Sequence, residues 1–245
     1  MYASRLNKVG DQMVEDWHSF LAPYRQAVEE LKVKFKGIRT EFEEANLHSP
    51  IEFVTGRVKR PDSILRKAEF REVSDLNAHN IETVIEDIGG IRIMCQFVED
   101  IYQIVEILHQ REDFDIIVER DYISHKKASG YRSYHIVIAY PIERITGTDS
   151  ILVEIQVRTL AMNFWATIEH SLNYKYAGDY PLELHQRLER AAEAAFRLDE
   201  EMSEIREEIK EAQKYFQTTG SNSRKKTKSP NPVENQIEDK HKRPL

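Results

Sequence analysis

Two long stripes of apolar residues at helical spacing enclose a central region in which apolar residues alternate as they do in strands. The first stripe advances by steps of four and three residues from Trp17 to Phe42, and the second does so from Leu184 to Phe216. Between them the pattern predicts strands at residues 51–58, 91–97, 114–120, 132–140 and 150–158, with helices near 61–75, 99–110 and 159–173. A chain of this kind folds into one sheet flanked by helices.

The predicted fold class is α+β, with a mixed, mostly antiparallel five-stranded sheet and long N- and C-terminal helices. The segment Thr146-Gly147-Thr148-Asp149 has the composition of a hairpin turn, so the last two strands are expected to be antiparallel neighbours. Pro23 is expected to start or to kink the first long helix. The two apolar stripes need partners, and packing within the chain or against another subunit satisfies them equally.

Charge divides the chain into an acidic body and a basic end. The formal net charge is −7; residues 218–245 carry seven Lys and Arg against three Asp and Glu, or +4, which leaves −11 for residues 1–217. We expect an N-terminal extension over 1–16, a domain over 17–217 and a disordered basic tail over 218–245. The run from Arg224 to Lys228 suits single-stranded RNA, although a solvated tail is the simpler interpretation.

Features that the sequence lacks predict the cellular compartment and exclude several kinds of nucleotide and metal site. Cys95 is the one cysteine, and no segment resembles a signal peptide or a membrane span, so a cytoplasmic protein is expected. No glycine-rich phosphate loop and no Gly-x-Gly-x-x-Gly turn is present, so nucleotide binding would depend on side chains. No His-Asp pair and no His-Glu-x-x-His motif indicates a metal-dependent hydrolase.

Strict alternation assigns polar faces to two of the predicted strands. Arg92 lies on the polar face of one strand, and Glu154 and Gln156 lie on that of another. If these faces align, they converge on one open surface, with Asp87 just before the first of the strands. Asp87 and Glu154 can then hold Mg²⁺ through carboxylate oxygens while the metal bridges substrate phosphates. On spacing alone, a solvated sheet face with ordinary charged residues is the simpler interpretation.

Two further segments have compositions that suit nucleotides. The cations of Gly56-Arg57-Val58-Lys59-Arg60-Pro61, followed by Arg66 and Lys67, suit a triphosphate. In the segment from Lys126 to His135, Tyr131 can stack on a base while Lys127 and His135 reach phosphates. Taken singly, a charged loop, a core tyrosine and a structural histidine are the ordinary alternatives.

Four blocks in order resemble the synthetase domain of the RelA/SpoT family, and the likeness covers roughly residues 17 to 216. They are Glu52-Phe53-Val54-Thr55-Gly56-Arg57-Val58-Lys59, Glu86-Asp87-Ile88-Gly89-Gly90-Ile91-Arg92, Gly130-Tyr131-Arg132-Ser133-Tyr134-His135 and Val153-Glu154-Ile155-Gln156-Val157-Arg158-Thr159. The resemblance continues through Asn163-Phe164-Trp165-Ala166. It implies a nucleotidyltransferase-like synthetase fold and transfer of the β,γ-pyrophosphoryl group of ATP to the 3′-hydroxyl of GDP or GTP, which gives ppGpp or pppGpp and AMP.

The resemblance also implies roles for individual residues. Asp87 and Glu154 look like the Mg²⁺ ligands, and Glu154 like the base for the 3′-hydroxyl. The ATP-binding residues are implied to be Arg57, Lys59, Lys67 and Arg92, with the two arginines flanking adenine. The GDP- or GTP-binding residues are implied to be Tyr131, which stacks on guanine, with Lys127, His135, Gln156 and Asn163.

The small single-domain members of the family are homotetramers that bind alarmone in a central cleft. Lys32, Lys36 and Arg39 lie on one face of the first helix. Together with Phe53 and Thr55 they resemble that allosteric site, so activation by ppGpp or pppGpp is expected. A wet helix face that merely carries cations is the alternative.

The chain departs from the family pattern after Lys67. Residues 69–83 are poor in cations, and the spacing to Asp87 is longer than usual, so the sequence does not decide whether further ATP contacts lie there. The chain is expected to make the alarmone without hydrolysing it. Two other functions remain open: a template-independent nucleotidyltransferase, which releases pyrophosphate, and a nucleotide- or single-stranded RNA-binding regulator.

Overall fold

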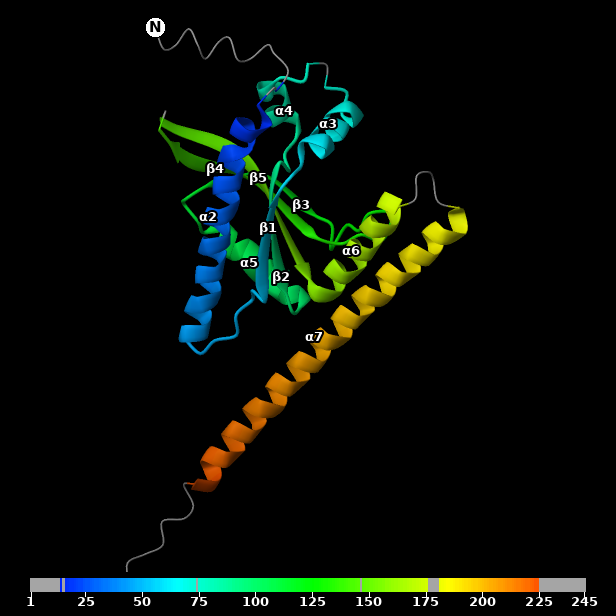
Figure 1. Cartoon of the computed structure of the whole chain (residues 1–245). Coiled ribbons are helices and arrows are strands. Elements are labelled where there is room, and N and C mark those ends of the chain that lie inside the picture. The colour runs from blue at the N-terminus through cyan, green and yellow to red at the C-terminus, as the bar shows by residue number, and fades with distance from the viewer. Residues whose placement is uncertain (1–13, 15, 74, 146, 176–180, 225–245) are drawn as a thin grey trace, which may run out of the picture. The chain divides into compact units, whose positions relative to one another are not determined.

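The computed structural model describes residue 14 and residues 16–73, 75–145, 147–175 and 181–224, with the side chains of 173–175 and 216–224 left aside. Its fold is α+β, as predicted (Figure 1). In chain order the elements are α2 (Trp17–Glu44), β1 (Phe53–Val58), α3 (Pro61–Phe70), α4 (Ala78–Val84), β2 (Gly89–Cys95), α5 (Val98–His109), β3 (Asp115–Asp121), β4 (Tyr134–Arg144), β5 (Gly147–Thr159), α6 (Leu160–Lys175) and α7 (Leu182–Arg224).

The five strands form one sheet in the order β1-β2-β5-β4-β3. β2 and β5 are parallel, and the other three pairs are antiparallel, so the predicted mixed, mostly antiparallel sheet is confirmed. One face of the sheet packs against α2 and α5. Ile91, Ile138 and Ile155 on that face are fully buried, as are Leu31 and Phe35 of the α2 stripe. The apolar alternation of the strands therefore builds the core and leaves the polar residues on the opposite face.

Helix α2 begins earlier than Pro23. Asp16 caps it, because its Oδ1 atom accepts hydrogen bonds from the backbone N–H groups of His18 at 3.0 Å and Ser19 at 3.1 Å. Pro23 lies inside the helix and is buried. Pro23 therefore does not start the helix.

The predicted helix over 61–75 is confirmed for residues 61–70 and extends too far beyond them. The helix α3 ends at Phe70, and Glu72 adopts a positive φ of 55°, which an α-helix does not accommodate. A separate helix, α4, follows after Asn77, whose side chain accepts the N–H of Asn80 at 2.8 Å. The helix α4 lies beyond the predicted segment and was not predicted from the sequence.

The predicted hairpin joins β4 and β5, but its turn lies earlier than expected. Arg144 pairs with Gly147, and Gly147, Thr148 and Asp149, which were predicted to form the turn, belong to β5. Gly147 has a φ of 117°, a conformation that glycine adopts without strain, and so it can open the strand directly after a short turn.

The last helix continues past the predicted start of the tail. α7 ends at Arg224, so residues 218–224 are helical, while residues 225–245, with most of the basic run, lie outside the described residues. The chain forms two units, Met1–Ser203 and Glu204–Leu245, and the whole sheet lies in the first. Within the described part of the chain, the helices are too short or too polar to cross a membrane.

One buried acid joins α7 to the end of the sheet and gives a stability prediction. Asp199 is 5% exposed and accepts a hydrogen bond from Thr159 Oγ1 at 2.6 Å. Burial raises the pKa of Asp199 from 3.8 to about 6. The stability that this group contributes is complete below pH 3.8 and is lost as the pH rises through about 6, so at pH 8 its buried charge opposes folding.

The Asp199→Asn substitution keeps the hydrogen-bond acceptor and removes the charge. It is expected to raise the free energy of unfolding by about 1–3 kcal/mol at pH 8, and by about half as much at pH 5. Urea unfolding followed by circular dichroism at both pH values measures the difference. A gain of the same size at both pH values would contradict this explanation.

Candidate active site

A cavity opens on the polar face of the sheet, over β1, β2 and β5. It is lined by Thr55, Gly56, Arg57, Asp87, Gly90, Ile91, Arg92, Glu154 and Gln156. The strand register explains the hollow: Gly90 pairs with Arg57 on one side and with Glu154 on the other. Because Gly90 has no side chain, the space between a cation and a carboxylate stays open.

A row of polar side chains crosses all five strands next to this gap. In register order the row is Thr55, Arg92, Gln156, His135 and Arg120. Arg92 Nε donates a hydrogen bond to Gln156 Oε1 at 3.2 Å. The predicted convergence of Arg92, Glu154 and Gln156 on one surface is therefore confirmed, and the row extends further, to His135 and Arg120.

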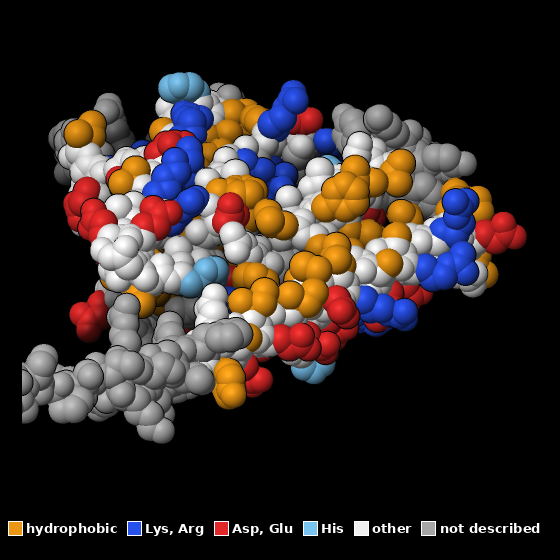
Figure 2. Space-filling model, turned by 90° about the horizontal axis from the view of Figure 1, so that it is seen from below, with side chains coloured by type: hydrophobic (Ala, Val, Ile, Leu, Met, Phe, Trp, Pro, Cys, Tyr) orange, Lys and Arg blue, Asp and Glu red, His pale blue; other side chains and the backbone are white. Residues whose placement is uncertain are grey.

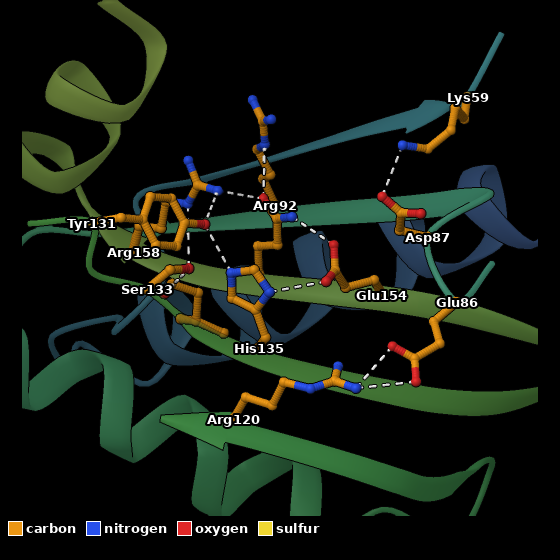
Figure 3. Close-up of polar contacts among 12 residues, drawn as sticks. Lys59, Glu86, Asp87, Arg92, Arg120, Tyr131, Ser133, His135, Glu154 and Arg158 are labelled. Atoms are coloured by element: carbon orange, nitrogen blue, oxygen red, sulfur yellow. Dashed lines mark hydrogen bonds and ion pairs between the residues drawn. The ribbon is translucent and has the colours of Figure 1, made fainter. Parts of the chain in front are cut away.

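Asp87 lies at one end of the cavity, just before β2, and contacts two cations. Its carboxylate is 2.8 Å from Lys59 Nζ and 2.8 Å from Lys67 Nζ (Figure 3 shows the first contact). Burial alone raises the pKa of Asp87, but the hydrogen bonds from the two lysines outweigh it and hold the pKa below its ordinary value. Asp87 is therefore ionised at neutral pH, and two of the cations assigned to ATP lie beside it.

Glu154 lies on β5 and is ionised for a similar reason. His135 Nδ1 is 2.9 Å from its Oε1 atom, and Gln156 Nε2 donates a hydrogen bond to its Oε2 atom at 2.6 Å. Burial raises the pKa of Glu154, yet the contacts with His135 and Gln156 lower it further, so the net shift is downward. A buried carboxylate that keeps its charge can bind a cation or accept a proton.

A second cavity adjoins the first and shares Arg57, Arg92 and Gln156 with it. Its other lining residues are Tyr131, Arg158, Ala166, Thr167, Glu169 and His170. Burial, together with the charges of Arg158 and Arg57, lowers the pKa of Arg92 to about 10. Three arginines held this close repel one another, which favours binding of an anion between them.

Tyr131 is fixed by its hydroxyl group in this second cavity (Figure 3). Arg158 Nη2 donates to that hydroxyl at 2.7 Å, and His135 Nε2 lies 2.8 Å from it. When His135 carries its proton on Nδ1, one chain of hydrogen bonds runs from Arg158 through Tyr131 and His135 to Glu154. Tyr131, which is assigned to stack on guanine, is thereby connected through hydrogen bonds to Glu154, which is assigned as the proton acceptor.

Two of the residues predicted to bind GDP or GTP, Lys127 and Asn163, lie outside the linings of the two cavities. Lys127 Nζ lies 4.3 Å from the ring centre of Tyr122 and 5.0 Å from that of Tyr131, beside the second cavity. Asn163 lies on α6, and its buried Oδ1 atom has no hydrogen-bond partner among the described residues.

The predicted allosteric residues divide between the two faces of β1. The Gly56 position faces Val28 and Lys32 of α2, whereas Thr55 lines the first cavity on the other face. Phe53 shares the face of Thr55 and is 40% exposed. Lys32 and Arg39 contact Glu29 and Glu43 of their own helix, at 2.8 Å and 2.7 Å. Arg39 Nη1 also donates to the carbonyl of Glu52, directly before Phe53, whereas Thr55 lies on the opposite face of β1 from Lys32.

Several residues at the site were not assigned from the sequence. The alternation of β5 does place Arg158 on the polar face, but its burial to 4% exposure and its bond to Tyr131 depend on the fold. Arg120 ends the polar row and contacts Glu86 at 2.9 Å. Thr167 and His170 enter the second cavity from α6, which no strand pattern indicates.

The donor atoms of the first cavity fit Mg²⁺ bound together with a nucleotide. Asp87 and Glu154 line one hollow and are both ionised. Mg²⁺ in phosphoryl-transfer sites is commonly held by one or two carboxylates, with substrate phosphates and waters completing its shell. Within the described residues no group of three or more His, Cys, Asp or Glu side chains can hold a metal by itself. A dedicated metal cage is therefore absent from that part of the chain.

The chain has the fold of the small alarmone synthetases. Small alarmone synthetase 1 from Bacillus subtilis bound to its product pppGpp matches with a TM-score of 0.75 and 62% identity, over 79% of this chain and 97% of that one. The structure of the same synthetase bound to AMPCPP matches with a TM-score of 0.69 and 57% identity, over 80% and 98% of the two chains.

Sequence comparison gives the family. A family model described as a region found in RelA / SpoT proteins matches residues 56–179. The chain is 61% identical over 202 residues to the GTP pyrophosphokinase YjbM of Bacillus subtilis, covering 82% of this chain and 94% of that protein. The chain belongs to the RelA/SpoT family.

Proposed function

We propose that the chain is a GTP pyrophosphokinase that moves the β,γ-pyrophosphoryl group of ATP to the 3′-hydroxyl of GDP or GTP. The products are AMP and ppGpp or pppGpp. The observation that carries this proposal is a pair of joined cavities. The first is lined by ionised Asp87 and Glu154 and the second by Tyr131, while Arg57 and Arg92 line both. The kinship to a GTP pyrophosphokinase agrees with it.

ATP is assigned to the first cavity. Arg57 and Arg92, which line both cavities, flank the adenine ring, since a guanidinium plane stacks on an aromatic base. Lys59 and Lys67 contact the phosphates. Both lysines already lie 2.8 Å from Asp87, beside the carboxylate that is assigned to the cation. The phosphates of ATP are thus expected to bind beside Asp87, next to Lys59 and Lys67.

Asp87 and Glu154 would hold the Mg²⁺ ion, which supplies charge neutralisation for the phosphate oxygens as the phosphoryl bond is exchanged. Glu154 has a second role as the proton acceptor. Its lowered pKa keeps it deprotonated at neutral pH, and His135 fixes its orientation at 2.9 Å.

GDP or GTP is assigned to the second cavity. The guanine base stacks on Tyr131, whose ring is held by Arg158 at its hydroxyl. Lys127, His135, Gln156 and Asn163 are assigned to the acceptor nucleotide. The buried Oδ1 atom of Asn163, which has no partner within the described part of the chain, is a free acceptor on α6.

The transfer forms one bond and breaks one. The acceptor 3′-oxygen attacks the β-phosphorus of ATP, while the bond from that phosphorus to the oxygen bridging the α- and β-phosphates breaks. AMP leaves with that oxygen, and the proton of the 3′-hydroxyl passes to Glu154. Positioning and charge neutralisation supply most of the rate in such reactions.

Anion-exchange separation of the nucleotides tests the reaction class. The purified chain is incubated with Mg²⁺, ATP and either GDP or GTP. Equal amounts of AMP and of a guanosine 3′-diphosphate derivative are expected. Unchanged nucleotides with both acceptors would refute the proposal and favour a nucleotide-binding regulator.

We further propose a homotetramer as the active form. The groove between α6 and α7 is lined by apolar side chains that remain exposed, among them Leu160 at 46%, Phe164 at 69% and Leu198 at 54%. Figure 2 shows groups of apolar side chains at the surface. Apolar area of this kind favours a subunit contact. Light scattering is expected to give the mass of four chains, and a monomer mass would contradict this assignment.

Assembly would also explain the division of the allosteric residues. Lys32 of α2 lies on the other side of β1 from Thr55, so a pppGpp site that includes both residues would need a second copy of the chain. Cations on one copy and the β1 face of another would then enclose the polyphosphate. We place this enzyme in the cytoplasm, where the buried thiol of Cys95 stays reduced.

Product activation gives a prediction for Lys36, which is exposed on α2. Added pppGpp is expected to raise the initial rate about fivefold or more, and Lys36→Ala to remove that increase while the basal rate stays unchanged. Arg25→Ala, which removes another cation of the same helix, is the control and should keep the activation. A Lys36→Ala variant that responds fully to pppGpp would exclude this residue from the site.

A further inference from the structure

The turn that carries Tyr131 rests directly on α7. Gly130 in this turn has a φ of 86°, and a Cβ atom built on it would lie 2.6 Å from the Cβ of Ala192. Trp165 Nε1 of α6 donates to the carbonyl of Leu188 at 2.9 Å, which holds this part of α7 in place. The backbone next to Tyr131 and the helix surface are therefore in contact, with no room for a side chain between them.

One carboxylate of α7 holds both sides of this turn. Glu193 Oε2 lies 3.0 Å from Lys126 Nζ and 3.1 Å from Arg132 Nη2. Lys126 precedes Gly130 and Tyr131 in the chain and Arg132 follows them, so Glu193 bridges the two ends of the segment. The turn itself is closed by a hydrogen bond from Gly130 N to Lys127 O at 2.8 Å.

Arg132 depends on Glu193 for charge compensation. Its side chain is 7% exposed, and its guanidinium lies 3.9 Å from the ring centre of Phe196. Its Nε and Nη1 atoms have no hydrogen-bond partner among the described residues. A buried cation that loses an ion partner is costly, so the loss of the Glu193 carboxylate would favour arrangements in which Arg132 leaves the helix.

We propose that Glu193 is a positioning residue for the acceptor nucleotide: its carboxylate clamps the turn through Lys126 and Arg132 and so holds Tyr131 where the guanine base stacks. This inference rests on the proposed function, because it assigns Tyr131 to GDP or GTP. The sheet fixes the hydroxyl of Tyr131 through Arg158 and His135, and α7 fixes its backbone. ATP binding is assigned to Arg57, Lys59, Lys67 and Arg92, which belong neither to this turn nor to α7, so it is not expected to depend on Glu193.

The test compares binding of GDP and of α,β-methylene ATP to the full chain by calorimetry. Glu193→Gln keeps the size of the side chain and removes the charge. If the turn is in its binding arrangement for only part of the time, the Kd for GDP rises in proportion, here about five- to tenfold. The Kd for the ATP analogue should stay within about twofold, and the KM for GDP should rise with kcat nearly unchanged.

Three further variants sharpen the result. Glu200→Gln removes an exposed acid of the same helix and should leave both Kd values unchanged. Lys126→Gln, at a side chain that is 43% exposed, should weaken GDP binding less than Glu193→Gln does, and remains informative if that variant fails to fold. In the double variant Glu193→Gln/Lys126→Gln, the increases in the Kd for GDP should not add, because each substitution removes the contact between Glu193 and Lys126.

The two proposals fail in different ways. If the unaltered chain binds GDP and forms product while Glu193→Gln and Lys126→Gln keep its Kd for GDP, the clamp is refuted and the function stands. If both nucleotides lose affinity together, Glu193 has a general structural role and the clamp is refuted as well. If the unaltered chain neither binds GDP nor forms product, the proposed function itself fails, and the clamp fails with it.

Discussion

Replacing Glu154 with glutamine is expected to lower the rate of AMP formation about a thousandfold or more, because it removes both a metal ligand and a proton acceptor. Glutamine keeps the size of the side chain and can still accept a hydrogen bond from His135 Nδ1, which lies 2.9 Å from the carboxylate. The fold should therefore be unchanged. Initial rates at saturating ATP and GDP, with circular dichroism of the folded protein, measure the effect.

Glu119→Gln is the matched control for this substitution. Glu119 lies on the same sheet and also contacts a histidine, with its Oε1 atom 2.7 Å from His109 Nε2. It lines neither of the two cavities described above. The control should keep nearly full activity. Equal losses in both variants would mean that carboxylate–histidine pairs support the fold, and a fully active Glu154→Gln variant would remove Glu154 from the chemistry.

Replacing Asp87 with asparagine is expected to lower the rate of synthesis about a hundredfold or more. The carboxylate is assigned to the cation, and asparagine offers a neutral oxygen in its place. The substitution also leaves Lys59 and Lys67, each 2.8 Å from Asp87, without their anion, so a modest drop in melting temperature is expected as well. Rates measured over a range of Mg²⁺ concentrations should show a higher Mg²⁺ requirement in whatever activity remains.

Asp113→Asn separates the catalytic effect from the loss of ion pairs. Asp113 also lies between two cations, 2.7 Å from Lys34 Nζ and 2.7 Å from Arg111 Nη2, but it lines neither of the two cavities. Burial raises its pKa, and hydrogen bonds from Arg111 and Lys34 outweigh burial and lower it to about 2. This variant should lose stability above pH 4 and keep its kcat. If it lost as much activity as Asp87→Asn, the role of Asp87 would be structural.

The strand pattern was enough to predict which side chains share a face. Alternation placed Glu154 and Gln156 on the polar face of one strand and Arg92 on that of another, and the observed register aligns the two faces by pairing Arg92 with Gln156. The two-residue period of a strand is a local property, so it is visible in the sequence. The order of the strands is not local, and it was the order that placed Gly90 between Arg57 and Glu154 and so opened the cavity.

Other features depend on contacts between distant segments, which a single sequence does not show. The break between α3 and α4 depends on Glu72 adopting a positive φ, a conformation that glutamate rarely adopts. Glu193 reads as one more charge on a long helix, because its contacts with Lys126 and Arg132 join segments more than sixty residues apart. The division of the predicted allosteric residues between two faces of β1 became visible only with the position of α2.

The fate of the individual phosphates of ATP tests the central claim most directly. The chain is incubated with Mg²⁺, GDP and ATP labelled at the β-phosphorus, and the label is followed through the separated nucleotides. Pyrophosphoryl transfer predicts that the label appears in a guanosine 3′-diphosphate product while AMP is unlabelled. Label released as free pyrophosphate, with the α-phosphate joined to the acceptor, would contradict it and identify a nucleotidyltransferase instead.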